Sequence, residues 1–366
     1  MFDNLARMGN FVYLVIIVAA FSVSCVLTPL MRRYAIKLGI VDKPDGKRKL
    51  QKKPVAYLGG IAIAVSFLAV CLAVGFFTDF YDARYMVILA GSVLILALGF
   101  LDDLFDLNPF VKFFGQIAVA TLTAVVGGAV EYITVFDIYI EFGALSVPIT
   151  VLWIVLVTNA VNLIDGLDGL ACGVSVFSLM ALFLSALIIG DDMCAVLACA
   201  LCGAALGFLP YNLYPASIFM GDAGALFLGY VMSCISVFGF FKGQAFFSII
   251  VPALILALPV TDAVALFFTR LSKGRSPFSA DRLHIHHKLL DMGLTPRQAV
   301  HVLYALSSLF SISAMVYIKY KLLAFGIAAV TFVIMALIKF LPSLPRLNTR
   351  KRSGDKLGEE SNGGNL

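Results

Sequence analysis

The feature that most constrains this chain is a succession of long apolar runs separated by short polar segments. Eleven runs approach the roughly 20 residues that a helix needs to cross a membrane. They are expected at 11–31, 57–78, 85–101, 113–130, 148–163, 170–189, 193–209, 223–240, 245–269, 299–317 and 322–340. Charged residues make up only 13% of the chain, against about 25% in a soluble domain. The sequence therefore predicts an all-α polytopic integral membrane protein with about 11 transmembrane helices.

The segments between and after the runs indicate how the chain is organised. The first run has no small-residue cleavage site and is too long for a signal peptide, so we expect it to be the first span. EYITVFDIYIEFG, residues 131–143, alternates apolar residues around Asp137 and predicts a small β-hairpin outside the membrane. We expect one transmembrane domain over 1–341, followed by a polar, glycine-rich and disordered tail at 342–366.

Lysine and arginine are distributed unequally between the two sides of the membrane. If the N-terminus lies outside, 22 of the 27 basic residues fall on the inner side. The positive-inside rule then favours a cytoplasmic C-terminus and an extracytoplasmic hairpin. The inner loops are more basic than topology requires, which suits an anionic partner. We therefore expect a multi-pass protein of the inner or plasma membrane, with its functional face in the cytoplasm.

Acidic and amide side chains gather near helix ends on that same inner face. They are Asp102, Asp103, Asn159, Asn162, Asp165, Asp168, Asn212 and Asp222, with Asp262 inside the ninth run and Asp281 after it. An aspartate in the membrane costs about 2.5–3.5 kcal/mol at mid-bilayer and less near the interface. Carboxylates without matching buried lysines indicate a divalent cation, and all-oxygen ligands favour Mg²⁺, or Mn²⁺, over zinc. Because Mg²⁺ commonly takes further ligands from phosphates, a nucleotide-diphosphate substrate fits this pattern.

Each of these motifs also has a simpler structural interpretation. Asp102 and Asp103 could end a helix in solvent, the Asp-Gly pairs of DGLDGL are typical of turns, and Asp222 could cap a helix. Asp262 could be a structural partner of Arg270, an alternative that the sequence leaves open. Cys199 and Cys202 form a C-x-x-C without a second pair, which favours packing over a zinc or redox site.

Four motifs taken in order resemble a known family. They are the Asp102-Asp103 pair, NAVNLIDGLDGLA, FMGDAGALFLG and DRLHIHHKLL. Together they are similar to the polyprenyl-phosphate N-acetylhexosamine-1-phosphate transferases, the glycosyltransferase 4 type, over roughly residues 40 to 300. GRSPF at 274–278 followed by HIHH resembles the branch that uses UDP-GlcNAc to begin envelope glycans such as lipopolysaccharide or teichoic acid.

The resemblance implies a reaction and a set of site residues. The reaction is Mg²⁺-dependent transfer of GlcNAc-1-phosphate from UDP-GlcNAc to undecaprenyl or another polyprenyl phosphate, with release of UMP. Asp222 would hold the metal, Asp102 would activate the lipid phosphate, and Asp103 would support the metal or the diphosphate. The remaining roles are phosphate binding by Lys112, stacking on uracil by Phe219, and lining of the nucleotide-sugar pocket by Asn162, Asn212, Asp165 and Asp168.

Three of the four histidines lie in the segment SADRLHIHHKLL, at His284, His286 and His287. They follow a basic loop that carries Arg275 and Arg282, so we expect the whole segment to cover the diphosphate and the sugar. The spacing is not that of a helical zinc pair, which places histidines four residues apart. Hydrogen bonding to substrate is therefore the favoured role, with structural packing or zinc as alternatives.

Two substitutions and two rival functions limit these expectations. In RKLQKKPVAYLGG many relatives carry His at the position of Gln51 and Arg at that of Tyr57, so one fixed positive charge is absent. The first rival is the same chemistry on UDP-MurNAc-pentapeptide or another UDP-N-acetylhexosamine. The second is a transporter, although such proteins often show repeated halves and midplane sites that this sequence lacks. No nucleic-acid partner is expected, and a homodimer is the assembly to test.

Overall fold

The computed structural model describes residues 11–42, 54–78, 82–135, 138–240, 249–274 and 283–340. Within these ranges ten helices are long and apolar enough to span a membrane. They are α2 (Phe11–Leu38), α3 (Gly59–Thr78), α4 (Ala83–Phe105), α5 (Pro109–Gly127), α6 (Ser146–Ile164), α7 (Leu170–Ile189), α8 (Asp192–Asn212), α9 (Gly221–Phe240), α13 (Pro296–Tyr317) and α14 (Lys321–Phe340). The prediction of an all-α polytopic membrane protein is confirmed. Helices dominate because backbone groups in lipid must be paired within the segment itself.

The ninth apolar run differs from the uninterrupted helix that we expected. It forms two shorter helices, α10 (Ile250–Ile255) and α11 (Ala257–Ser272), which meet at Leu256. Pro259 lies in the first turn of α11 and has no N–H to donate to a preceding turn, so a continuous helix is interrupted there. This interruption explains why ten helices, rather than eleven, are long enough to span a membrane in the described part of the chain.

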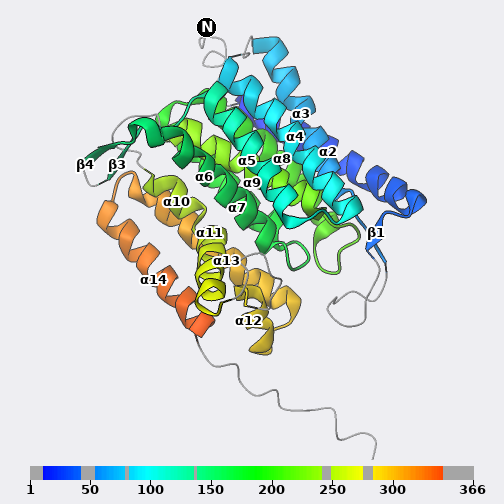
Figure 1. The fold of residues 1–366 in the computed structure, drawn as a ribbon. Coiled ribbons are helices and arrows are strands. Elements are labelled where there is room, and N and C mark those ends of the chain that lie inside the picture. Colours follow the sequence, from blue (N-terminus) through cyan, green and yellow to red (C-terminus); the bar gives the residue numbers. More distant parts are fainter. Residues whose placement is uncertain are drawn as a thin grey trace, which may run out of the picture.

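Small strands mark the two ends of the helical bundle. β3 (Tyr132–Val135) pairs antiparallel with β4 (Ile138–Glu141), which confirms the predicted hairpin, and a short 3₁₀ helix, η1 (Gly143–Leu145), follows it. β1 (Val41–Asp42) pairs with β2 (Val55–Ala56). Three long helices, α3 to α5, separate β2 from β3 along the chain, so the two pairs lie at opposite ends of the bundle (Figure 1). The predicted tail at 342–366 lies outside the described residues.

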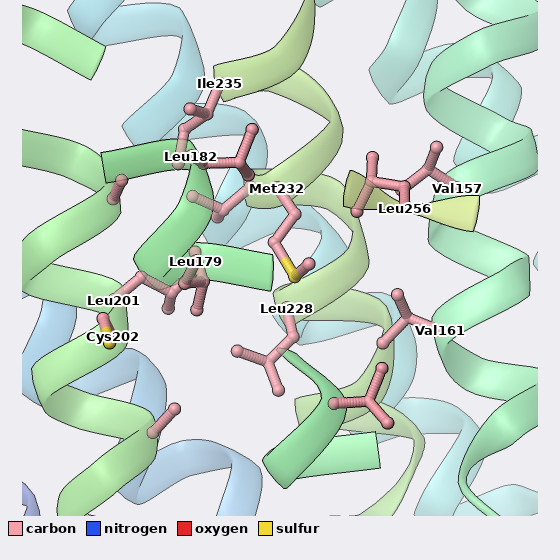
Figure 2. Packing of buried hydrophobic residues seen from close by; sticks show 14 of the residues in the cluster. Val157, Val161, Leu179, Leu182, Leu201, Cys202, Leu228, Met232, Ile235 and Leu256 are labelled. Atoms are coloured by element: carbon pink, nitrogen blue, oxygen red, sulfur yellow. The ribbon is translucent and has the colours of Figure 1, made fainter. Parts of the chain in front are cut away.

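Helix α9 forms the centre of the core. In the apolar 18-residue segment of α9 that could cross the membrane, 94% of the residues are buried inside the protein. The corresponding share is 28% for α2 and 22% for α14. Figure 2 shows Leu228, Met232 and Ile235 of α9 surrounded by apolar side chains of neighbouring helices, among them Leu182 and Val161. Because α9 is enclosed on all sides, its first turn is held in one place relative to the other helices. The outer helices α2 and α14 are left to face lipid.

The packing of α8 against α2 depends on two glycines spaced four residues apart. A Cβ at Gly203 would overlap the carbonyl oxygen of Ile17, and one at Gly207 would overlap that of Phe21. Small residues at this spacing let two helix backbones approach closely, which is a common way for helices to associate in membranes. These glycines therefore allow α2 to pack closely against α8.

We expect Gly203→Ala to lower the stability of the folded protein by about 1–3 kcal/mol, because the added methyl group must push α2 away from α8. Gly326→Ala in α14 is the matched control, since nothing lies within 4 Å of a Cβ placed there. Thermal unfolding in detergent measures both variants. Equal Tm values for the two variants would contradict the close approach of α2 and α8.

Candidate functional site

Four helix ends meet at the end of the bundle where β1 and α12 (Ile285–Asp291) lie (Figure 1). They are the last turn of α4, the first turn of α5, the last turn of α6 and the first turn of α9. Asp106 leaves α4 in the left-handed conformation, and Asn108 caps α5 by accepting the N–H of Phe110 at 2.9 Å. This tight turn brings Asp102 and Lys112 together, although ten residues separate them in the chain.

The ammonium group of Lys112 lies between two carboxylates. Its Nζ is 2.8 Å from Oδ2 of Asp102 and also forms an ion pair with Oδ2 of Asp222. Asn162 donates from Nδ2 to Oδ1 of Asp222 at 2.8 Å, and its Oδ1 lies 3.4 Å from the lysine. The side chain of Asp222 is 35% exposed, whereas that of Asp102 is 10% exposed. Asp222 is therefore the carboxylate of this pair that a ligand can reach.

Asp103 holds the beginning of α9. Its Oδ1 accepts the backbone N–H of Asp222 at 2.8 Å, and its Oδ2 accepts that of Ala223 at 3.0 Å. These are helix N-terminal donors, which have no partner within their own helix. Gly221 precedes them with φ +71°, and a Cβ there would crowd the carboxylate of Asp103. The carboxylate of Asp103 thus directs the backbone that carries Asp222, and Asp222 is not itself the cap.

The loop between α6 and α7 is hydrogen-bonded to the end of α8 and to the segment that follows it. Asp168 accepts the N–H of Ala216 at 2.8 Å through Oδ2. Buried Asn212 accepts the N–H of Gly169 at 3.1 Å and donates to the carbonyl of Ile218 at 3.1 Å. The side-chain amide of Asn212 is therefore engaged by backbone on both sides, a bracing position that the sequence did not suggest. Its predicted contact with a nucleotide stays a prediction.

Asp165, the C-cap of α6, faces the acidic cluster. Burial, followed by the charges of Asp222, Asp103 and Asp168, raises the pKa of Asp165 to about 8. Burial also raises the pKa of Asp168, while the N–H of Ala216 opposes this shift. The loop thus adds carboxyl groups to a region that already holds negative charge. Such a region attracts cations and positively charged groups.

An aromatic pair lies beside the cluster. Phe219 and Tyr57 contact edge to face with ring centroids 5.9 Å apart. The backbone N–H of Phe219 donates to the carbonyl of Ala56 at 2.8 Å, and the N–H of Gly59 donates to the carbonyl of Phe219 at 3.0 Å. Tyr57, at the sequence position where we expect an arginine in many relatives, is therefore a neighbour of Phe219. The role of Phe219 as a base-stacking residue stays a prediction.

The three histidines lie at the start of α12 and contact one another. The rings of His284 and His286 stack at 5.3 Å, and those of His286 and His287 lie 4.3 Å apart. His286 packs on Gly166, where a Cβ would overlap its Nε2. The histidine segment thus touches the loop that carries Asp165 and Asp168. Arg275, Arg282 and Asp281 lie outside the described residues, as do Gln51 and the lysines near it.

Among the described residues, no group of three or more His, Cys, Asp or Glu side chains is arranged to hold a metal ion. Asp102 and Asp222 nevertheless converge on one positive charge, the ammonium of Lys112. Their oxygens are the donors that Mg²⁺ prefers, and Mg²⁺ usually keeps waters or takes substrate phosphates for its other positions. The donor set therefore fits Mg²⁺ held by few protein ligands. It does not fit a closed zinc site, which needs four nitrogen or sulfur ligands.

Two polar neighbours of the site carried no clear signal in the sequence. Gln116, one turn deeper than Lys112, accepts a hydrogen bond from Nδ2 of Asn159, one turn deeper than Asn162. Lys339 near the end of α14 forms an ion pair with Asp262 at 3.0 Å. Asn159 is among the polar residues that the sequence places at this face, and only the i, i+4 spacing from Lys112 could have pointed to Gln116. Nothing in the sequence relates Lys339 to Asp262.

Comparisons with known proteins identify the family of this chain. A family model described as Glycosyl transferase family 4 matches residues 85–240. A probable undecaprenyl-phosphate N-acetylglucosaminyl 1-phosphate transferase of Bacillus subtilis (strain 168) is 41% identical over 307 residues, which cover 82% of this chain and 84% of the relative. The chain belongs to glycosyl transferase family 4. The family thus supports an enzyme, embedded in the membrane through many helices.

Two further relatives are less similar to this chain. A decaprenyl-phosphate N-acetylglucosaminephosphotransferase of Mycolicibacterium smegmatis is 28% identical, covering 85% of this chain and 84% of the relative. An undecaprenyl-phosphate alpha-N-acetylglucosaminyl 1-phosphate transferase of Escherichia coli (strain K12) is 31% identical, covering 73% and 74%. The family-4 segment contains α4 to α9, and with them Asp102, Lys112, Asn162 and Asp222. The histidine segment lies beyond it.

The raised pKa of Asp165 predicts a pH dependence of stability. In the unfolded chain this carboxyl loses its proton near pH 4, and in the folded protein near pH 8. The folded state therefore binds more protons between these values, and its stability falls as the pH rises through that window. We expect the Tm in metal-free buffer to fall less for Asp165→Asn than for the wild type between about pH 5 and pH 9.

Glu131→Gln, an exposed acid at the hairpin end, is the control and should follow the wild-type curve. The pKa of Asp168 is also raised, so we expect Asp165→Asn to reduce the slope of Tm against pH rather than abolish it. Parallel curves for Asp165→Asn and the wild type would show that burial does not hold a proton on Asp165.

Proposed function

We propose that this protein transfers GlcNAc-1-phosphate from UDP-GlcNAc to a polyprenyl phosphate such as undecaprenyl phosphate, giving polyprenyl-diphosphate-GlcNAc and UMP. The observation that carries the proposal is the placement of Lys112 between Asp102 and Asp222 at the meeting point of four helix ends. The printed names of the relatives, which describe N-acetylglucosaminyl 1-phosphate transfer onto undecaprenyl or decaprenyl phosphate, support it. The site lies at a bundle end, where a lipid headgroup and a soluble nucleotide sugar can both arrive.

The chemistry needs charge neutralisation more than a base. An oxygen of the polyprenyl phosphate attacks the β-phosphorus of UDP-GlcNAc, and the bond from that phosphorus to the bridging oxygen breaks as UMP leaves. A phosphate monoester has a second pKa near 6, so the attacking oxygen is largely ionised at pH 7. Both reactants are anions, and their approach requires positive charge at the site. Direct attack by the lipid phosphate is therefore the mechanism that we propose.

The proposed roles follow from which groups are accessible. Lys112, which pairs with Asp222 in the structure, would contact phosphate oxygens, and Asp222, the more exposed of its two partners, would hold Mg²⁺. Mg²⁺, or Mn²⁺, supplies further neutralisation of the diphosphate when bound. Asp103 was expected near the metal; because both its oxygens accept N–H groups of α9, we assign it the positioning of Asp222. Asp102 stays beside Lys112 and keeps the lysine charged.

The surrounding groups complete the proposed pocket. Asp165 and Asp168 border it from the α6–α7 loop, and Phe219 borders it from the other side with Tyr57. Arg275, Arg282 and the histidine segment are proposed to cover the diphosphate. The basic residues of the loops on this side of the chain support a cytoplasmic location for this end of the bundle under the positive-inside rule. The inner or plasma membrane is the proposed location, with UDP-GlcNAc bound from the cytoplasmic side.

Purified protein with tritium-labelled UDP-GlcNAc, undecaprenyl phosphate and Mg²⁺ tests the proposal. We expect a butanol-extractable labelled product from the wild type and none above background from Asp222→Ala. EDTA should abolish the product and excess Mg²⁺ should restore it, because two anions cannot be neutralised by Lys112 alone. Glu131→Gln, an acid at the opposite end of the bundle, should keep wild-type activity.

Equal product from the wild type and Asp222→Ala would contradict the assignment of Asp222. Product from UDP-MurNAc-pentapeptide instead of UDP-GlcNAc would keep the reaction type and change the donor. Uptake of nucleotide into vesicles without any lipid-linked product would favour a transporter.

Direct attack makes a separate prediction for single-turnover conditions. Without the lipid acceptor, we expect no UMP release and no labelled sugar on the protein, because the acceptor phosphate is the nucleophile. Rapid quenching followed by nucleotide chromatography measures UMP. Stoichiometric UMP release, or an acid-labile phosphosugar on an aspartate, would instead establish a covalent intermediate.

A further inference from the structure

A second buried carboxylate lies outside the cluster just described. Asp262, on α11, is 3% exposed and has partners on two other elements of the part of the chain that the structure describes. Its Oδ2 lies 3.0 Å from Nδ1 of His284, and its Oδ1 accepts from Nζ of Lys339 at 3.0 Å and from the N–H of Ile285 at 3.3 Å. A buried carboxylate is costly unless it is paired and hydrogen-bonded. Asp262 therefore links three elements: α11, the end of α14, and the first turn of α12.

Helix α12 depends on such anchors for its position. It has seven residues, far fewer than an isolated helix needs to be stable in water. His284 is its N-cap but makes no side-chain capping bond within the helix. The carboxylate of Asp262 instead pairs with the imidazole of His284 and accepts a hydrogen bond from the first free N–H of the helix, that of Ile285. Negative charge at this end also suits the helix dipole.

The position of α12 determines where the next two histidines lie. His286, 2% exposed, packs against Gly166, one residue after Asp165. Neither ring nitrogen of His286 has a hydrogen-bond partner among the described residues. Burial and the neighbouring His287 and His284 lower the pKa of His286 to about 3, which keeps the ring neutral at physiological pH. Because the ring of His286 contacts Gly166, a shift of α12 would change the contact between this ring and the loop that carries Asp165 and Asp168.

We propose that Asp262 is a positioning residue for the transfer reaction: it holds His284 and the start of α12, and thereby sets His286 and His287 against the Asp165–Gly169 loop. The inference rests on the proposed function and concerns the side of the site that receives the nucleotide sugar. Asp262 itself touches no substrate. Lys339 of α14 balances the charge of Asp262, so that the acid can remain ionised where it is buried.

The main alternative is that Asp262 and Lys339 only join α11 to α14. Removing one member of a buried ion pair leaves the other charge unpaired and destabilises the fold, whereas removing both can be nearly neutral. The double variant Asp262→Asn/Lys339→Met therefore separates the two roles. It restores electrical balance between the two helices but leaves His284 and the N–H of Ile285 without their anionic partner.

The experiment uses the purified full-length protein and three measurements: Tm, hydrogen exchange of residues 285–291, and steady-state kinetics for both substrates. For the double variant we expect a Tm close to that of the wild type, faster exchange in α12, and a loss of kcat/KM for UDP-GlcNAc on the order of 10- to 100-fold. The loss should include a raised KM for UDP-GlcNAc, with the KM for polyprenyl phosphate unchanged. Lys339→Met alone should lower Tm and keep the KM for UDP-GlcNAc.

Matched controls remove the same chemical groups elsewhere. Lys321→Met changes an exposed lysine at the other end of α14, and Asp191→Asn changes the N-cap of α8 at the opposite end of the bundle. Both should leave exchange in α12 and the KM for UDP-GlcNAc unchanged.

Substitution of His284 distinguishes its two ring nitrogens. The amide of His284→Asn places a donor near the position of Nδ1 and can keep the bond to Asp262, whereas that of His284→Gln places it near Nε2. If anchoring is the role of His284, the Asn variant should keep the slower exchange in α12 and more of the activity.

Either of two results would overturn the proposal: unchanged exchange in α12 of the double variant, or wild-type kinetics despite faster exchange. A wild type that gives no product from UDP-GlcNAc would refute the proposed function alone. The exchange measurement needs no substrate, so it would still decide whether Asp262 holds α12.

Discussion

The arrangement of the site depends on compensating acidic charge at the ends of membrane helices. Asp102 and Asp222 come from helices separated by more than a hundred residues, and the ammonium of Lys112 lies between them. Without that cation, two carboxylates would face each other beside apolar helices, which is energetically unfavourable. The lysine therefore allows α4, α5 and α9 to meet at one point. Under the proposed function, a substrate phosphate or a divalent cation would enter at this point by exchanging partners with Lys112 and Asp222.

The surrounding structure makes this meeting point rigid. α9 is almost entirely enclosed by other helices, and Asp103 receives the N–H groups of its first turn. The loops that complete the site are tied to each other by hydrogen bonds between side chains and backbone, made by Asn212 on one side and Asp168 on the other. Positioned donors and acceptors of this kind cost no reorganisation during a reaction. A site built on helix ends is therefore suited to bringing two anions together.

Much of the site could be predicted from residue types, but their individual roles could not. The clustering of Asp102, Asp165 and Asp222 at one end of the bundle follows from counting spans. An even number of membrane spans separates these residues along the chain, so all three fall on the same side of the membrane. The division of labour between Asp102 and Asp103 does not follow, because adjacent aspartates on a helix point about 100° apart and only the neighbouring helices decide what each one meets. Nothing in the sequence indicated that the amide of Asn212 joins two loops, because its backbone partners are decided by how the loops pack.

The sequence by itself determined that this is a polytopic helical membrane protein, that a hairpin lies between the fourth and fifth runs, and which motifs carry the polar chemistry. These properties are local, since they depend on the length and polarity of continuous segments. Only the tertiary structure decided that the ninth run is broken at Leu256, that Lys112 bridges Asp102 and Asp222, and that Lys339 balances Asp262. The partners in such ion pairs lie far apart in the chain. Their pairing depends on how whole helices pack, which no local pattern of residues encodes.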